Sequence, residues 1–246
     1  MCSSTSSAAP VPPTLFEMRT YTLHPSMAAE YLRRTNEAAA LRKEVLPLLG
    51  FWGVEVGGQL STVKHLYGHQ SMAARAETRR AMVGNESWQE YLAAAKACIA
   101  AEHAEIFSEC PDVMRAAASP ASAADFAPPS QSSSEAPASG VYELREYQLV
   151  AGYGSVGKLR EAFVRGLGSK VAADVNGKLA FFGYSEFGVL NKVVEVWRYP
   201  SAEACIQGRI AARKATEWRE VVGTVAPFAD RFQSQIMVPL AFSPWS

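Results

Sequence analysis

Two short strings of this chain place groups capable of acid–base and anion-binding chemistry at alternate positions. The strings run from Phe16 to Leu23 and from Tyr142 to Leu149, and each carries a glutamate, an arginine and a tyrosine two residues apart. Because alternate side chains of a strand point to the same face, each string is expected to present an acid, a cation and a phenol together. These residues are Glu17, Arg19, Tyr21, Glu143, Arg145 and Tyr147.

Two interpretations of these groups remain open. The acids and the arginines can form an ion-pair network that lines the interface of a sheet, which is a structural role. Alternatively, Arg19 and Arg145 can hold the oxygens of an anionic ligand, because a guanidinium can donate two parallel hydrogen bonds to such a group.

His65 is a further candidate for chemistry, because the matching position later in the chain is Glu195. An imidazole exchanges a proton near neutral pH, so His65 could serve as a general base or a haem ligand, and Tyr21 is a second candidate for proton transfer. Glu55 or Glu195 is expected to orient the ring. The alternative is that His65 only completes a hydrogen-bond network with these acids.

Metal and cofactor motifs are absent from the sequence. His65 and His69 have a spacing that could hold a metal, but no acid or cysteine joins them at a matching spacing. No phosphate-binding loop, nucleophile elbow or dinucleotide fingerprint occurs. We therefore predict no metal and no resident cofactor, with haem as the exception to be tested. The cysteines, expected to be reduced thiols of an intracellular protein, are Cys2, Cys98, Cys110 and Cys205.

An internal repeat determines where these residues lie. The first string returns at an offset of 126, and a later series of residues returns at an offset of 130. The difference of four residues is about one helical turn, which a helix absorbs without changing the face that it buries. A period of this length indicates a duplicated domain. The later series is Gly53, Gly58, Leu60, Val63, Ser71, Arg79 and Trp88, matched by Gly183, Gly188, Leu190, Val193, Ser201, Arg209 and Trp218.

The composition suggests how the chain is divided. We predict a disordered tail over residues 1–13, a first repeat over 14–110, a flexible linker over 111–140 and a second repeat over 141–246. The linker is rich in Ala, Pro and Ser, which cannot bury a core. Lys+Arg and Asp+Glu both number 24, so no net charge favours nucleic acid. No run reaches the roughly 18 apolar residues of a membrane span, and the tail lacks the charged and apolar regions of a secretory signal.

Each repeat is expected to contain the same elements in the order βαββαβ. A helix follows the first strand, with Ser26 as its N-cap in the first repeat, and Ser71 and Ser201 are expected to cap a later helix. This order is that of the ferredoxin-like fold, a four-stranded antiparallel sheet with helices on one face. The predicted class is therefore α+β, with two sheets packing as an α+β barrel. The predicted strands are Leu15–Leu23, Phe51–Val56, Leu60–His69 and 105–108, and in the second repeat Val141–Val150, Phe181–Phe187, Leu190–Tyr199 and 235–238.

Alternation along the strands predicts which residues share a face. An apolar set is assigned to the helix-covered face: Phe16, Met18, Leu66, Tyr142, Leu144, Val194 and Val196. A polar and aromatic set is assigned to the opposite face, where two stacked sheets would bury it. That set is Glu17, Arg19, Tyr21, His65, Tyr67, Glu143, Arg145, Tyr147, Glu195 and Trp197. Trp88 and Trp218, on helical segments, are predicted to be core anchors rather than site residues.

Several strings of the first repeat carry a family resemblance. They are F-E-M-R-T-Y-T-L-H-P, then L-L-G-F-W-G-V-E-V-G, V-K-H-L-Y and W-Q-E-Y-L. Together they resemble the NIPSNAP family of the dimeric α+β barrel superfamily, over most of 16–107 and more loosely over 141–240. The resemblance implies stacked sheets forming a barrel and an association with mitochondria or vesicle traffic. Cofactor-free and haem-degrading monooxygenases of the superfamily work inside such barrels. Trp52 and Glu55 are two further residues of the expected binding set.

Three functions compete at this point. The protein could bind a small apolar or aromatic molecule or act as a scaffold. It could be a monooxygenase-type or haem-binding enzyme that holds an apolar ring among aromatic side chains. It could also be an adaptor in organelle or vesicle traffic, with the linker and the tail as docking segments for protein partners. Assembly as a homo-oligomer, and a cytoplasmic location where no mitochondrial association applies, are further expectations.

Overall fold

The computed structural model describes residues 13–117 and 140–246, in which eight antiparallel strands close into one barrel. The strand order around the barrel is β1-β3-β2-β8-β5-β7-β6-β4. The predicted α+β barrel is therefore confirmed. The strands are β1 Leu15–Leu23, β2 Leu48–Val56, β3 Thr62–His69, β4 Ile99–Glu109, β5 Val141–Leu149, β6 Lys178–Phe187, β7 Lys192–Tyr199 and β8 Ala229–Pro239.

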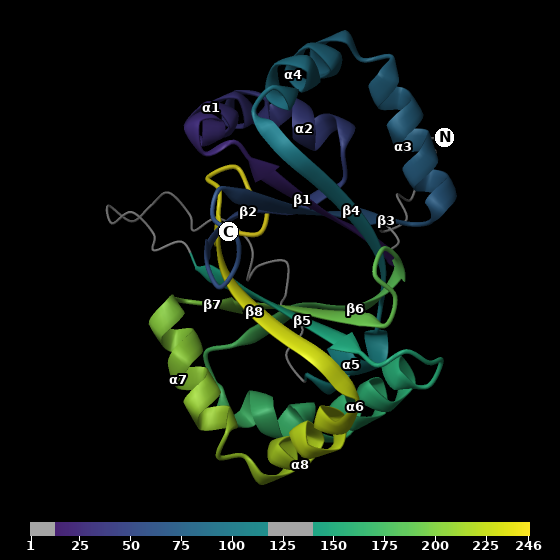
Figure 1. The fold of residues 1–246 in the computed structure, drawn as a ribbon, viewed down its shortest axis with the longest axis vertical. Helices are drawn as coiled ribbons and strands as arrows, with labels where there is room; N and C mark the ends of the chain where they lie inside the picture. The colour runs from purple at the N-terminus through teal and green to yellow at the C-terminus, as the bar shows by residue number, and fades with distance from the viewer. Residues whose placement is uncertain (1–12, 118–139) are drawn as a thin grey trace, which may run out of the picture.

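The helices form two outer layers, one over the strands of each repeat (Figure 1). The first repeat places its helices above β1–β4 in the view, and the second places its helices below β5–β8. The helices are α1 Ala28–Glu37, α2 Ala39–Val45, α3 Met72–Val83, α4 Glu86–Lys96, α5 Pro111–Ala116, α6 Ser155–Ala173, α7 Ala202–Ala212 and α8 Thr216–Val225, with short 3-10 turns at Pro25–Met27 and Ala226–Phe228.

The two repeats have the same strand order and close the barrel by pairing with each other. Each repeat forms a four-stranded sheet, β4-β1-β3-β2 in the first and β8-β5-β7-β6 in the second. The edge strand β2 pairs with β8, where Trp52 lies opposite Pro239, and β4 pairs with β6, where Glu109 lies opposite Gly183. Closure leaves no free strand edge, which removes the usual route to edge-to-edge aggregation.

Local signals place most of the helices, with one exception. Ser71 and Ser201 cap α3 and α7 as predicted, because each side chain accepts a hydrogen bond of 3.1 Å from the backbone N–H three residues on. Ser26 is not an N-cap. The chain passes through the 3-10 turn first, and α1 then begins after Met27 without a side-chain cap. The first repeat also breaks its helix at Ala38, whereas α6 is one continuous helix of 19 residues.

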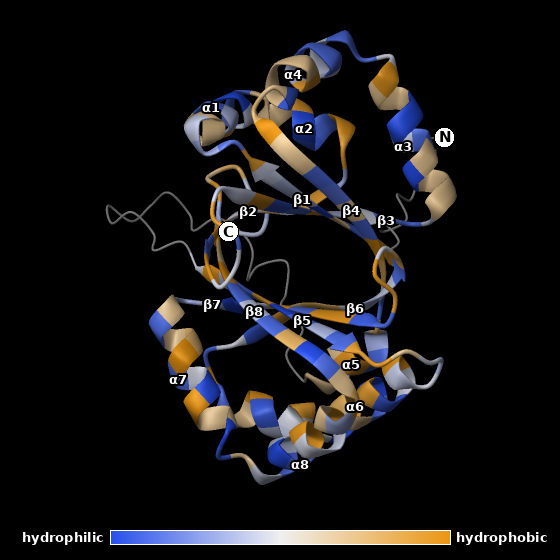
Figure 2. Ribbon diagram, in the orientation of Figure 1, coloured by the Kyte–Doolittle hydropathy of each residue, from blue (hydrophilic) through white to orange (hydrophobic). Residues whose placement is uncertain are grey.

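One part of the barrel interior is filled by apolar side chains from both repeats, and another part holds Lys192, whose Nζ lies 2.6 Å from Glu105 and 3.6 Å from Glu146. Phe16 and Phe181 bring their ring centroids to 4.5 Å, and Trp52 and Tyr142 bring theirs to 5.3 Å. An eight-stranded barrel is just wide enough for its inward side chains to fill it. The strands interleave polar and apolar residues (Figure 2). The buried apolar cluster is Phe16, Met18, Trp52, Val54, Leu66, Phe107, Tyr142, Leu144, Phe181, Val194, Val196 and Met237.

The predicted sets of residues that share a face are correct, but the assignment of the faces is wrong. The apolar set predicted to face the helices points into the barrel. The polar set predicted to lie between the sheets faces the helices instead, where Glu17 bonds Arg75 of α3 and Glu143 pairs with Arg209 of α7. Alternation identifies the members of a face, not what covers it. The helices supply the countercharges for these two acids, which compensates their burial.

The start of the predicted linker is helical. α5 packs on α6, where Asp112 bonds Arg160 at 3.0 Å, and Val113 is fully buried. The remainder of the predicted linker and the predicted N-terminal tail, residues 118–139 and 1–12, lie outside the described residues.

Candidate functional site

Each repeat contains a cavity between its helices and its sheet. The second-repeat cavity has a volume of about 450 Å³ and lies between β5 and β8 on one side and α6, α7 and α8 on the other. The first-repeat cavity has a volume of about 400 Å³. The two are lined from matching positions of the repeats. The matched pairs include Arg19 and Arg145, Tyr21 and Tyr147, Arg79 and Arg209, Trp88 and Trp218, Leu92 and Val222, and Ile99 and Ala229.

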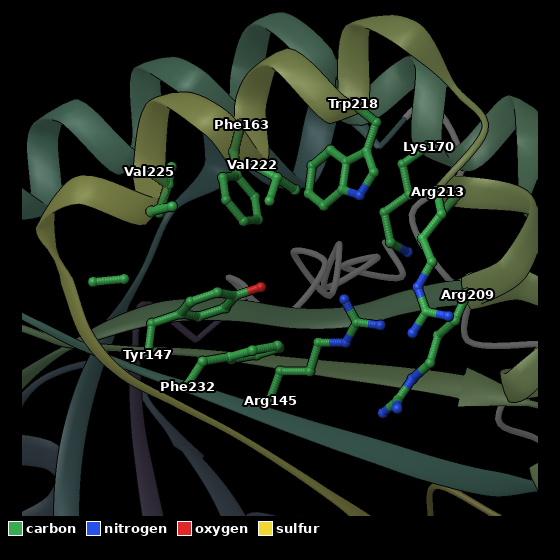
Figure 3. Close-up of a pocket in the computed structure, with 13 residues that line it drawn as sticks. Arg145, Tyr147, Phe163, Lys170, Arg209, Arg213, Trp218, Val222, Val225 and Phe232 are labelled. Atoms are coloured by element: carbon green, nitrogen blue, oxygen red, sulfur yellow. The ribbon is translucent and has the colours of Figure 1, made fainter.

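The second-repeat cavity has an apolar end and a cationic end (Figure 3). At the apolar end, rings from the helices and from the strands face each other across the space. At the other end the nitrogen atoms of four basic side chains gather. The apolar side chains are Tyr147, Phe163, Trp218, Val222, Val225 and Phe232, and the basic ones are Arg145, Lys170, Arg209 and Arg213.

Glu143 forms the centre of an ion-pair network beside this cavity. Its fully buried carboxylate accepts a hydrogen bond of 2.8 Å from Arg145 Nε, pairs with Arg209, and accepts a hydrogen bond of 2.9 Å from Ser234 Oγ. Burial alone would raise the pKa of Glu143, but the two arginines bring it down to about 2. Arg145 binds the acid through Nε, and the end of its guanidinium points into the cavity (Figure 3). Arg145 can therefore bind Glu143 and a ligand in the cavity at the same time.

Lys170 is a buried amine that sequence reasoning missed. Among the described residues its Nζ has no hydrogen-bond partner, and it lies 3.7 Å from Asp174 and 3.2 Å from the centre of the Trp197 ring. Burial, followed by the charge of Arg145, lowers its pKa to about 8. One signal could have identified it: Lys170 lies three residues after Leu167, on the apolar stripe of its helix. A lysine there must enter the interior.

Glu195 and His65, the predicted acid–imidazole partners, belong to separate networks. Glu195 accepts hydrogen bonds of 2.5 Å from Tyr147 Oη and Trp197 Nε1. His65 Nδ1 is 2.7 Å from Tyr67 Oη. Neither predicted acid orients His65, since in the described residues Glu195 bonds Tyr147 and Trp197 of its own repeat, and Glu55 is exposed. That part of the prediction is wrong.

His65 is enclosed by aromatic rings and lines neither cavity. Phe51 stacks on it at 4.7 Å and Tyr21 meets it edge-on at 4.6 Å. Burial, with the charges of Arg42 and Arg19, lowers the pKa of His65 well below its usual value, so the ring is neutral at physiological pH.

Glu17 is the first-repeat equivalent of Glu143. It binds Arg19 at 2.8 Å and Arg75 at 2.7 Å, and His69 Nε2 lies 3.5 Å away. Burial would raise the pKa of Glu17, but these three partners hold it well below its usual value. Sequence reasoning missed Arg75, which lies on α3 one turn after its N-cap Ser71.

The remaining predicted residues lie at different depths. Trp52 packs inside the barrel, away from both cavities. Tyr67 accepts a hydrogen bond of 2.6 Å from Arg42, and Trp197 lies beneath Lys170. Trp88 and Trp218 are buried as core anchors are, yet each also lines the cavity of its repeat.

Two further features concern metals and membranes. Within residues 13–117 and 140–246, no three His, Cys, Asp or Glu side chains converge as metal ligands. In the same ranges, no helix is both long enough and apolar enough to cross a membrane. The described cysteines, all free and buried, are Cys98, Cys110 and Cys205.

Comparison with known proteins gives matches over both repeats. The NIPSNAP family model matches residues 16–112 and 142–244. The human protein NipSnap homolog 3A is 30% identical over 233 residues, which cover 93% of this chain and 85% of that protein. Two bacterial structures, from proteins provisionally named monooxygenases, share the fold. The Lactobacillus acidophilus protein has a TM-score of 0.59 at 10% identity, with 92% of this chain and 94% of that chain covered. The Fusobacterium nucleatum protein has a TM-score of 0.61 at 8% identity, with 93% of each covered.

Proposed function

Given that this chain belongs to the NIPSNAP family, we propose that it binds a small amphipathic organic anion in the second-repeat cavity. The single observation that carries the proposal is the division of that cavity into an apolar end and a cationic end. Ligand pockets combine a largely apolar lining with a few polar groups that fix orientation. A ring or short chain with one carboxylate or similar acidic group matches both ends.

The basic side chains at the cationic end favour a ligand with a negative charge. Arg145 points the end of its guanidinium into the cavity, and Arg213 approaches from the end of α7 (Figure 3). Lys170 adds an amine without a hydrogen-bond partner. Glu143 already binds Arg145 and Arg209, so the remaining cationic groups favour an anion from outside.

The aromatic side chains at the apolar end favour a ligand with an aromatic or branched apolar portion. Tyr147 and Phe232 stack at 4.6 Å on the sheet side. Phe163 and Trp218 meet edge-on at 5.2 Å on the helix side. Aromatic pairs of these two geometries present both faces and edges to a third ring. A planar ligand between the two pairs would make contacts of the same kinds.

This proposal moves the expected ligand from the barrel interior to the helix side of the sheet. The barrel interior is occupied by side chains. The monooxygenase-type or haem-binding alternative gains no support from His65, which lines neither cavity, and Tyr21 lines the other cavity. Binding in the second-repeat cavity needs neither haem nor a metal.

A fluorescence titration with 1-naphthoate tests the proposal, since Trp218 lies at the site. Wild-type protein is expected to bind 1-naphthoate and to discriminate against uncharged 1-naphthalenemethanol. Phe232→Ala is expected to weaken binding by roughly tenfold, because the ligand loses about 1.4 kcal/mol of apolar contact. The matched control is Phe187→Ala, at an exposed phenylalanine that lines neither cavity, which should leave the affinity unchanged. Equal affinity for the charged and uncharged probes, or equal effects of both substitutions, would contradict the proposal.

A further inference from the structure

Arg42 is a buried cation that lacks an acidic partner. Its side chain donates hydrogen bonds of 2.6 Å to Tyr67 Oη and to Tyr91 Oη, and its guanidinium lies 5.1 Å from the Trp88 ring centre. Within residues 13–117 and 140–246, no carboxylate forms an ion pair with it. Aromatic faces and phenols stabilise a guanidinium but add no negative charge. A buried ion without a countercharge is costly.

The second repeat shows how such a cation is compensated elsewhere in the same fold. Lys170 lies over Trp197, the residue that matches Tyr67, and it has Asp174 at 3.7 Å. Glu195 lies two residues before Trp197 and bonds its ring nitrogen. In the first repeat the position of Glu195 is taken by His65, whose ring is neutral. The exchange of glutamate for histidine therefore removes a negative charge from beside the buried cation.

Three buried hydrogen-bond donors around the first-repeat cavity have no acceptor in the part of the chain that the structure describes. They come from three different helices: Tyr31 Oη from α1, Arg42 Nε from α2 and Trp88 Nε1 from α4. All three residues line the cavity. Buried donors are almost always paired, because an unpaired one costs its full desolvation. Their convergence on one space, beside an uncompensated cation, indicates a missing acceptor that carries negative charge.

We infer that the first-repeat cavity is a second binding site, for a small polar molecule that carries a carboxylate or phosphate group. The oxygens of that group accept hydrogen bonds from Tyr31, Arg42 and Trp88, and its charge replaces the one that Glu195 supplies in the second repeat. Exposed Arg79 and Lys96 also line the cavity, together with exposed Glu102, so that its basic side chains outnumber its one acid and favour an anion. The site is separate from the second-repeat cavity and does not depend on the function proposed for it.

Isothermal titration with inorganic phosphate and, separately, with succinate tests the site and distinguishes the two anion classes. Wild-type protein is expected to bind one of them. Arg42→Met should weaken that binding by roughly thirtyfold, because a charge-assisted hydrogen bond is lost. The matched control is Arg33→Met, at an exposed arginine of α1 that pairs with Glu30 and Glu37 and lines neither cavity, which should leave the affinity unchanged. No binding of either anion by the wild type, or equal affinity in Arg42→Met, overturns the inference.

A second variant keeps the test decisive if Arg42→Met does not fold. Tyr31→Phe removes only the hydroxyl that lacks an acceptor. The variant is expected to bind the anion roughly fivefold more weakly than the wild type. Tyr142→Phe, a change of the same kind inside the barrel, should have no effect on the affinity. If the two tyrosine variants bind the anion equally, the hydroxyl of Tyr31 does not contact it and the assignment of the site is wrong.

Discussion

Replacing Arg145 with methionine is expected to destabilise the protein by roughly 3 kcal/mol, since it removes a buried cation from beside two buried acids, Glu143 and Glu195. Glu143 is fully buried and loses its 2.8 Å hydrogen bond from Arg145 Nε. Burial by itself would lower the pKa of Arg145, but Glu143 and Glu195 raise it well above its usual value. Arg145 therefore compensates two buried acids, and the variant disturbs both.

Urea denaturation at pH 7 measures this loss. Arg19→Met is the matched control in the first repeat. It should cost less, because Arg19 lies beside one buried acid, Glu17, whereas Arg145 lies beside two. Adding Glu143→Gln to Arg145→Met should restore part of the stability, because the buried acid that has lost one of its two cationic partners is then uncharged. If Arg145→Met unfolds at the same urea concentration as the wild type, the network does not contribute as described.

Replacing Lys170 with methionine is expected to have the opposite sign and to stabilise the unliganded protein. The pKa of Lys170 is lowered to about 8 from an ordinary value of 10.5. Because each pKa unit corresponds to about 1.4 kcal/mol, the buried ammonium costs on the order of 3 kcal/mol at pH 7. Methionine has a similar length without the charge. Asp174 keeps the Tyr199 hydroxyl at 2.8 Å and the Gly177 N–H at 3.1 Å.

The pH dependence provides a test specific to Lys170. Between its folded pKa and its unfolded pKa, the unfolded chain binds more protons, so stability rises with pH in that window. The difference in the free energy of unfolding between Lys170→Met and the wild type should therefore decrease by about 1 kcal/mol between pH 7 and pH 9. Urea denaturation of both proteins across this range measures it. A difference that stays constant with pH would show that Lys170 does not titrate there.

Arg145 and Lys170 are buried cations that line one cavity, yet their replacement by methionine is expected to change the stability of the protein in opposite directions. Arg145 donates a short hydrogen bond to a carboxylate, whereas Lys170 Nζ lies 3.7 Å from its acid and donates none. The attraction between buried ions offsets their loss of hydration only when the geometry is good. A residue kept in spite of such a cost is a candidate for function, which agrees with the place of Lys170 in the proposed ligand site.

The sequence by itself determined the duplication, the order of the elements and the sets of residues that share a face. Strings that recur at a constant offset must form the same local structure, and a strand with a period of two keeps Glu17, Arg19 and Tyr21 together whatever covers them. The caps at Ser71 and Ser201 were predictable for the same reason, since a cap involves only residues three positions apart.

Only the tertiary structure decided which face the helices cover and which charges meet. Arg75 and Arg209 reach their acids across about 60 residues of chain, and nothing local in the sequence pairs them. Apolar residues of β1 and β5 fill part of the barrel, so Glu17 and Glu143, at the alternate positions, face the helix layer. Both cavities lie between the helix layer and the sheet. The roles of Arg42 and Lys170 beside them therefore depend on how helices and strands that are distant in the sequence pack together.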